Sequence, residues 1–210
     1  MKLLIFDFDG TIADTKEVYY HAMFGQLKEK GFDNKRIVRA IDMGMSLRKT
    51  LQNLGLGFIV SWIMKKRIMK TVKKEVDYVK KCRDVSAIKD IYEKKIIVTN
   101  SLKEFAIPIL RHLKLKKYFS EVYGADDFSD KLEFIRGYLK NNKIAKKECY
   151  YVGDRAADVA LARKVGCVSV IVSGKCAWNS RQELVEASPD FLLSDIGDLK
   201  QVLQNQDIHA

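Results

Sequence analysis

Two aspartates, Asp7 and Asp9, follow the apolar run Leu3–Ile5 near the start of the chain. Side chains alternate along a strand, so carboxylates two positions apart point to one face, while Phe6 and Phe8 point to the other, into a core. Paired carboxylates repel each other, and one of them would be protonated unless something compensates the charge. A divalent cation together with a phosphate-sized substrate would compensate it. The spacing therefore predicts an enzyme.

A second acidic pair follows the apolar run 149–152. Asp154 comes directly after Gly153, and Asp158 lies four residues further on, in the first turn of an expected helix. Acidic residues are favoured at helix N-termini, so either aspartate alone has a structural explanation. Both together, after a buried strand, favour metal binding. Oxygen ligands in this number suit Mg²⁺, which keeps several waters and takes a few carboxylates plus the phosphate of a substrate.

Two further positions could bind a phosphate. A strand-like run ends at Thr99, and Ser101 with Glu104 is the pattern of a capping box that opens a helix. The Thr99 hydroxyl and free N–H groups would then face the sheet edge, where helix starts bind phosphate. Lys131, at the start of another expected helix, could neutralise both the phosphate and the paired aspartates. Each feature is weak alone and gains weight from the acidic pairs.

Strand-like runs alternate with helical patterns, which predicts a parallel sheet covered by helices on both faces. The strands are expected at 2–8, 95–99, 120–123, 149–152 and 168–172, and the helices at 102–113, 132–139, 156–165 and 182–187. Ligands bind beyond the carboxyl ends of the strands in such sheets, which is where Asp7 and Asp9 lie. The segment 16–84 reads as helices only, at 17–30, 35–41, 47–54 and 58–81, and is expected to be an inserted module.

The net charge of +11 invites a nucleic-acid interpretation, because clustered lysines and arginines attract phosphates. No zinc-finger spacing or aromatic RNA-binding motif supports it in the sequence. The basic run between Lys65 and Lys81 is better explained as the solvated face of an amphipathic helix. With 47% apolar and 31% charged residues, the chain has the composition of a soluble globular protein with a core.

The four cysteines show no CxxC pairing and no metal-ligand spacing. Cys149 and Cys167 lie in apolar runs, where a free cysteine behaves as a small buried hydrophobe. Because the N-terminus carries no secretory pattern, we expect a reducing, cytoplasmic location. The longest apolar stretch, residues 54–64, is too short to cross a bilayer, so no membrane association is expected.

Taken in order, these features resemble the four motifs of the haloacid dehalogenase-like (HAD) phosphohydrolase superfamily. The motifs are Asp7-Phe8-Asp9-Gly10-Thr11, then Thr99, then Lys131, then Gly153-Asp154 with Asp158. The first is the most specific. The third departs from the family pattern, because it lacks the Lys-Pro often found there. Lys116 and Lys117 therefore remain alternatives to Lys131.

The helical segment is similar to the C1-type cap of that superfamily. Within it, Gly44-Met45-Ser46-Leu47-Arg48 resembles a cap segment of phosphoglycolate phosphatase-like members. The resemblance thus implies an α/β fold with two parts. A Rossmann-like, doubly wound parallel sheet forms the core, residues 1–15 and 85–210, and an all-helical cap domain spans residues 16–84.

The resemblance also implies a role for each candidate. Asp7 would be the nucleophile that forms an aspartyl-phosphate, and Asp9 the acid for the leaving alcohol and then the base for water. Mg²⁺ would be bound by the Asp7 carboxylate, the Asp9 backbone carbonyl and Asp154, with Asp158 acting through water or supporting the other ligands. The groups expected to bind the substrate are Thr99, Asn100, Lys131 and, for a distal anionic group, Arg48.

We therefore predict a Mg²⁺-dependent phosphomonoesterase acting on a small soluble phosphate ester, with a phosphoglycolate-like substrate as one candidate. Two alternatives remain open from the residues alone. One is a phosphomutase or phosphotransferase on the same core, and the other is a basic nucleic-acid-binding protein without turnover. The expected partner is a small phosphorylated molecule rather than a nucleic acid or a membrane. The chain is expected to be a monomer or a homodimer.

Overall fold

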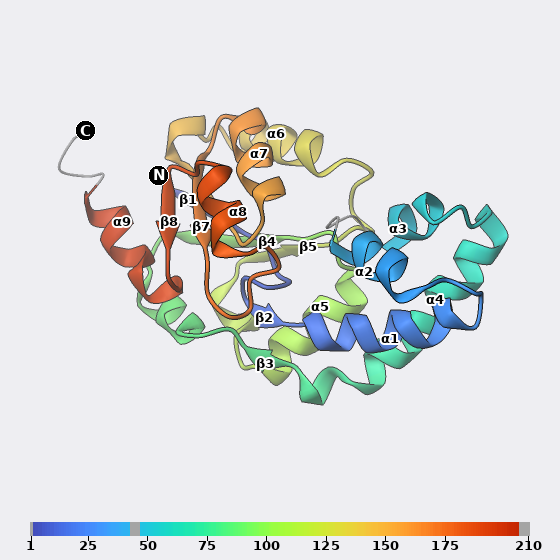
Figure 1. Ribbon diagram of the computed structural model, residues 1–210. Helices are drawn as coiled ribbons and strands as arrows, with labels where there is room; N and C mark the ends of the chain where they lie inside the picture. Colours follow the sequence, from blue (N-terminus) through green and yellow to red (C-terminus); the bar gives the residue numbers. More distant parts are fainter. Residues whose placement is uncertain (1, 43–46, 206–210) are drawn as a thin grey trace.

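The computed structural model describes residues 2–42 and 47–205 of the chain. A six-stranded parallel sheet lies at its centre, in the order β5-β4-β1-β6-β7-β8 (Figure 1). The strands are β1 (Leu3–Phe6), β4 (Lys94–Val98), β5 (Glu121–Tyr123), β6 (Cys149–Gly153), β7 (Val168–Val172) and β8 (Phe191–Leu193). The first strand of the chain thus lies in the interior of the sheet, between β4 and β6. Its carboxyl end is flanked by those of both neighbours.

Helices cover both faces of the sheet, as the alternating pattern predicts. Leu3 and Ile5 of β1 pack in the same cluster as residues of α6 (Lys131–Asn141) and α7 (Ala156–Val165). Leu4 and Phe6 point the other way, into a cluster shared with α5 (Lys103–His112) and α9 (Leu199–Asn205). Figure 1 shows α6, α7 and α8 (Arg181–Glu186) above the sheet and α5 below it. The predicted doubly wound α/β core is confirmed.

In the part of the chain that the structure describes, four helices form an insertion between the first two strands of the main sheet. They are α1 (Lys16–Lys28), α2 (Asn34–Asp42), α3 (Leu47–Asn53) and α4 (Phe58–Lys74). The chain enters and leaves the insertion through two short strands, β2 (Ala13–Asp14) and β3 (Lys80–Lys81), which pair antiparallel. We call this pair the hinge ribbon. It places the helices to one side of the sheet (Figure 1).

The last helix of the insertion is shorter than its sequence pattern suggests. A helix is predicted over 58–81, but α4 ends at Lys74, and a 3-10 turn (Val76–Tyr78) and strand β3 follow. Pairing with β2 draws these last residues into an extended conformation, against their helical period. The prediction of a strand-free segment is wrong at this point.

The outer face of α4 changes character along its length. Ile68, Met69 and Val72 are buried, while Lys66 and Lys70 are exposed, so the basic run lies on a solvated face as predicted. The first two turns also expose large apolar side chains: Phe58, Ile59, Trp62 and Ile63. The outer face is therefore apolar at its start and basic at its end.

Other elements are too short for the sequence pattern to predict them. Residues beyond 187 carry no predicted element, yet β8 and α9 lie there. The three residues of β8 are only half-buried at the edge of the sheet, too few to show a period. Short 3-10 turns occur at Val85–Asp90, Lys116–Tyr118, Lys146–Glu148 and Ile196–Asp198. Among the described residues, no helix combines the length and apolar character that a membrane span requires.

Two of the four cysteines are joined, which the sequence pattern does not suggest. Cys82 and Cys176 form a disulfide across 94 positions of the chain, with Cα atoms 5.8 Å apart. Cys149 and Cys167 are free and buried, as predicted. Disulfides persist mainly in oxidising surroundings. The cytoplasmic location therefore stays a prediction, with this bond as a feature that does not favour it.

Candidate active site

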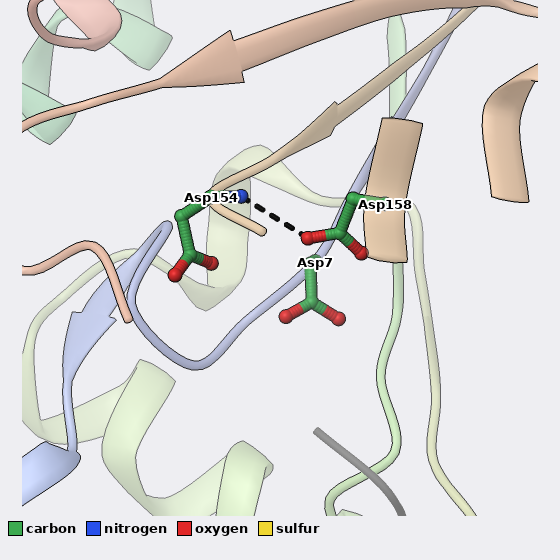
Figure 2. A group of neighbouring side chains, drawn as sticks. All are labelled: Asp7, Asp154 and Asp158. Carbon is green, nitrogen blue, oxygen red and sulfur yellow. Dashed lines mark hydrogen bonds between the residues drawn. The ribbon is translucent and has the colours of Figure 1, made fainter. Parts of the chain in front are cut away.

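Three buried carboxylates meet at the carboxyl edge of the sheet. Asp7 follows β1, Asp154 follows β6, and Asp158 lies in the first turn of α7. One carboxylate oxygen of each residue lies within 4.8 Å of an oxygen of both others. The Asp7 N–H donates to the carbonyl of Val152 at 2.8 Å, which continues the β1–β6 pairing beyond the strand. Figure 2 shows the three side chains beside one another, with Asp154 and Asp158 on either side of Asp7.

The Asp154 carboxylate is held from both sides. The Thr11 hydroxyl donates to one of its oxygens at 2.8 Å, and the Trp178 backbone N–H donates to the other at 2.8 Å. Gly10 makes this approach possible, because its φ is +80° and a Cβ there would lie 2.4 Å from the Asp154 oxygen. The glycine of the first motif thus leaves room for an aspartate of the fourth.

Asp158 supports the loop that carries Asp154. One of its oxygens accepts hydrogen bonds from the backbone N–H groups of Asp154 and Arg155, at 3.1 and 3.0 Å. The Tyr151 hydroxyl donates to the other oxygen at 3.2 Å. These bonds fit the expectation that Asp158 acts through water or supports the other ligands, and that role stays a prediction.

Lys131 lies against the first aspartate. Its ammonium is 2.7 Å from an oxygen of Asp7, and both side chains are about nine-tenths buried. Asp130 caps the start of α6 by accepting from two backbone N–H groups, which fixes where Lys131 begins the helix. The alternatives, Lys116 and Lys117, lie in the 3-10 turn after α5, where their ammonium groups contact Phe119 and Tyr118. The structure thus brings Lys131 to Asp7.

The cluster carries more negative charge than its surroundings neutralise. Burial raises the pKa of Asp154 well above its usual value, and the carboxylates of Asp158 and Asp7 raise it further. Burial and then the charge of Asp7 also raise the pKa of Asp158, with Lys131 opposing the rise. A divalent cation would remove this penalty, and three carboxylates at this spacing are a donor set that Mg²⁺ accepts.

Asp9 lies apart from the cluster in its own hydrogen-bond network. The Thr15 hydroxyl donates to one carboxylate oxygen at 2.7 Å, and the Ser101 hydroxyl donates to the other at 2.5 Å. The Thr99 hydroxyl lies 3.4 Å from that second oxygen. Burial, followed by the charge of Asp7, raises the pKa of Asp9 to about 6, although the hydrogen bonds oppose the rise. A carboxyl group with that pKa can donate a proton near neutral pH.

The predicted capping box at Ser101 and Glu104 is wrong. Helix α5 begins at Lys103, and its N-cap, Leu102, makes no side-chain cap. The Ser101 hydroxyl instead bonds to a carboxylate and to the Tyr19 hydroxyl of α1, while Glu104 pairs with Lys73 of α4 at 2.7 Å. Because α5 begins at Lys103, Ser101 lies one residue before the N-cap, and its hydroxyl donates a charge-assisted hydrogen bond to Asp9 instead.

A cavity of about 830 Å³ lies above these groups. Its lining includes most of the predicted site residues: Asp7, Asp9, Thr99, Asn100, Lys131, Asp158 and Arg48. The insertion also contributes Lys49 and Lys65, and the core contributes Arg155 and Lys164. Arg48 lies with its guanidinium 5.7 Å from the centre of the Phe58 ring. Residues 44–46 of the predicted cap segment lie outside the described part of the chain.

Several residues of the site were not predicted. Thr15 directly precedes α1 and Tyr19 lies within it, and nothing in their spacing indicates the contact with Asp9 or Ser101. Trp178 lies 24 positions beyond Asp154, in the loop after β7, where no motif marks it. Thr11 and Arg155 stand inside the motifs, so their positions, though not their partners, could have been inferred.

Comparison with known proteins identifies the family. The model of the haloacid dehalogenase-like hydrolases matches residues 4–172. A phosphoglycolate phosphatase of Aquifex aeolicus is 28% identical over 214 residues, covering 98% of each chain. The Escherichia coli (strain K12) phosphoglycolate phosphatase is 32% identical over 106 residues, which is 49% of this chain and 41% of its own length.

Solved structures show the same fold. A predicted phosphatase from Clostridium acetobutylicum has a TM-score of 0.80 at 21% identity, covering 97% of this chain and 98% of its own. A predicted phosphoglycolate phosphatase from Haemophilus somnus has a TM-score of 0.80 at 16% identity, with 97% and 98% covered.

An α/β sheet with buried carboxylates at its carboxyl edge, beneath a cavity that arginines and lysines also line, can hold a divalent cation next to an anionic ligand. The chain belongs to the haloacid dehalogenase-like hydrolases. Within them it is a phosphatase, a phosphoric monoester hydrolase, similar to the phosphoglycolate phosphatases.

Proposed function

We propose that this phosphatase is Mg²⁺-dependent, hydrolyses a small soluble phosphate ester, and works through an aspartyl-phosphate on Asp7. The observation that carries the proposal is that the two aspartates of the first motif lie in different surroundings. Asp7 is paired with Lys131 and lies among the carboxylates, whereas Asp9 is hydrogen-bonded by hydroxyl groups and has a pKa of about 6. One carboxylate is thus suited to attack, and the other to proton transfer.

The chain's own groups account for the two half-reactions. An oxygen of Asp7 attacks phosphorus, and Lys131 reduces the repulsion between that carboxylate and the anionic phosphate. Protonated Asp9 gives its proton to the departing alcohol oxygen, and the phosphoryl group stays on Asp7. Asp9, now ionised, takes a proton from water, whose oxygen attacks phosphorus and releases Asp7. Thr99 and Asn100 line the cavity, where they would hold phosphate oxygens.

Asp7 and Asp154 would hold the metal ion together with the backbone carbonyl of Asp9, and Asp158 would support them. The grouping of the carboxylates within 4.8 Å and their raised pKa values support this assignment. When bound, Mg²⁺ supplies positive charge that screens the phosphate from the carboxylates. Thr11 and Trp178 orient Asp154 for this task by hydrogen-bonding to both of its oxygens.

We also propose that residues 16–84 form a cap over a core made of residues 1–15 and 85–210. The hinge ribbon supports this division, because the insertion joins the core through two adjacent strands. Three cations of the insertion, Arg48, Lys49 and Lys65, line the same cavity as Asp7, Asp9 and Asp158. Cations there favour a substrate with a second anionic group, as in the phosphoglycolate named for the relatives. Arginine suits a carboxylate because its planar fork makes two parallel bonds.

Phosphate release from a panel of esters tests the proposal. The panel holds 2-phosphoglycolate, several sugar phosphates whose phosphate is their only anionic group, and an aryl phosphate, each assayed with Mg²⁺ and with EDTA. We expect release with Mg²⁺ only, and none from Asp7→Asn. The exposed Asp90→Asn is the matched control and should remain active. Activity that survives complete removal of metal would overturn the Mg²⁺ assignment.

The comparisons give no support to the phosphotransferase or the nucleic-acid-binding alternative. The small phosphorylated substrate is supported by the phosphatase relatives. A monomeric or homodimeric state stays a prediction.

A further inference from the structure

The loop after β7, residues 173–179, contacts both metal-site segments, and we call it the Trp178 loop. The Trp178 N–H donates to the Asp154 carboxylate at 2.8 Å. The Asn179 side chain accepts from the N–H of Ala156, the first residue of α7, at 2.9 Å. The loop therefore orients one proposed ligand directly and fixes the start of the helix that carries Asp158.

The same loop also touches the insertion. The Trp178 ring stacks on Tyr20 of α1, with ring centres 6.0 Å apart, and lies 6.4 Å from the ring of Tyr19. On another side the Arg155 guanidinium lies 4.3 Å from the Trp178 ring centre. Trp178 is thus packed between the first helix of the insertion and the fourth motif.

The Cys82–Cys176 disulfide ties this loop to the other end of the insertion. Cys176 belongs to the Trp178 loop, and Cys82 directly follows β3 of the hinge ribbon. The Cys82 N–H donates to the Ile12 carbonyl at 3.1 Å, so this cysteine is also fixed to the turn that follows Asp7. One covalent bond therefore links the return strand of the hinge, the turn of the first motif and the loop that orients Asp154.

We propose that the Cys82–Cys176 disulfide is a redox-controlled clamp that holds the Trp178 loop against the metal site, so that its reduction weakens binding of the divalent cation while the chain stays folded. The inference rests on the metal site of the proposed function. Outer contacts of this kind change metal affinity by about 10–100-fold when they are removed. Reduction loosens the loop without deleting the contact, so we expect an effect of about tenfold.

A dithiol reductant opens the clamp by thiol–disulfide exchange. Its thiolate attacks one sulfur, and the other sulfur leaves as a thiolate and takes up a proton. The second thiol of the reductant then attacks the mixed disulfide, so the reductant ends as a disulfide and the protein gains two electrons and two protons. Cys82 and Cys176 are 7% and 8% exposed, which predicts slow exchange and calls for excess reductant.

Binding of Mn²⁺ alone, followed by the electron paramagnetic resonance of the free ion, tests the proposal on the full chain. The untreated protein is compared with protein reduced by excess dithiol and freed of it under nitrogen. Thiol titration in denaturant should give two free thiols before reduction and four after. We expect the Kd for Mn²⁺ to rise about tenfold on reduction, with the circular dichroism unchanged.

Matched variants separate the clamp from a general effect of reductant. Cys82→Ser should bind Mn²⁺ as weakly as the reduced protein, whether or not dithiol is added. If the Cys82→Ser protein does not fold, Cys176→Ser provides the same test. Cys149→Ala removes a buried free thiol and should keep the full redox response. An equal Kd in both redox states, or four free thiols before reduction, overturns the clamp alone. Absence of Mn²⁺ binding in both states overturns the metal site itself, and with it the proposed function.

Discussion

Asp9→Asn should stabilise the metal-free protein above neutral pH while removing most of its turnover. Burial and the neighbouring Asp7 carboxylate raise the pKa of Asp9 from 3.8 to about 6 in the folded chain. A group with a raised folded-state pKa contributes its full stabilisation below the unfolded pKa and loses it as the pH rises through the folded pKa. The wild-type protein should therefore lose stability between pH 4 and pH 6, whereas asparagine does not titrate.

The size of the effect follows from the shift. About two pKa units correspond to at most roughly 3 kcal/mol, since each unit is worth about 1.4 kcal/mol. In a chain of this length that is a rise in Tm of roughly 6–12 °C. Asparagine has nearly the shape of aspartate, and its amide can still hydrogen-bond to the Thr15 and Ser101 hydroxyls. The stabilisation should therefore not be offset by a lost contact.

Thermal and urea unfolding in EDTA, at pH 4 and pH 8, measure this difference. Asp9→Asn and wild type should be equally stable at pH 4, and the variant should be the more stable at pH 8. The exposed Asp14→Asn is the matched control and should show no such divergence. A variant that is no more stable than wild type at pH 8, or a difference independent of pH, would refute the reasoning.

Three further changes test the site. Asp7→Asn should leave Tm within a few degrees and reduce turnover by several orders of magnitude; substantial activity would remove Asp7 as the nucleophile. Lys131→Met should lower kcat/KM by about 10²–10³-fold, since a cation beside the attacking carboxylate is lost; an unchanged value would make the ion pair structural. Arg48→Ala should raise KM for 2-phosphoglycolate with kcat unchanged and barely affect an aryl phosphate. Exposed Arg39→Ala is its control, and an equal effect on both substrates would remove Arg48 from the specificity site.

Local features of the fold were predictable from the sequence. The runs that become β1, β6 and β7 are short, apolar and followed by helical periods, so their type and direction follow from neighbouring residues. Because parallel strands have their carboxyl ends at the same edge of the sheet, the sequence also predicts that Asp7 and Asp154 lie at that edge. These steps need only contacts that are close in the sequence or dictated by the sheet.

Contacts between distant segments were not predictable in the same way. Nothing near Asp154 indicates that the Trp178 N–H will bond to it, and nothing near Cys82 indicates Cys176, 94 positions away. The local pattern predicts that the Ser101 hydroxyl caps a helix. In the structure this hydroxyl donates to the Asp9 carboxylate of the first motif instead. Such choices are made by the tertiary structure, which a local pattern does not contain.

The most direct test of the account is whether Asp7 carries a phosphoryl group during turnover. Asp9→Asn, which should form the intermediate from an aryl phosphate with a good leaving group but hydrolyse it slowly, is mixed with that substrate and Mg²⁺ and quenched in acid. Peptide mapping by mass spectrometry should then find one phosphoryl group on the peptide that contains Asp7. The double variant Asp7→Asn/Asp9→Asn should show none. Phosphate release without any phosphorylated peptide, together with turnover by Asp7→Asn alone, would contradict the mechanism.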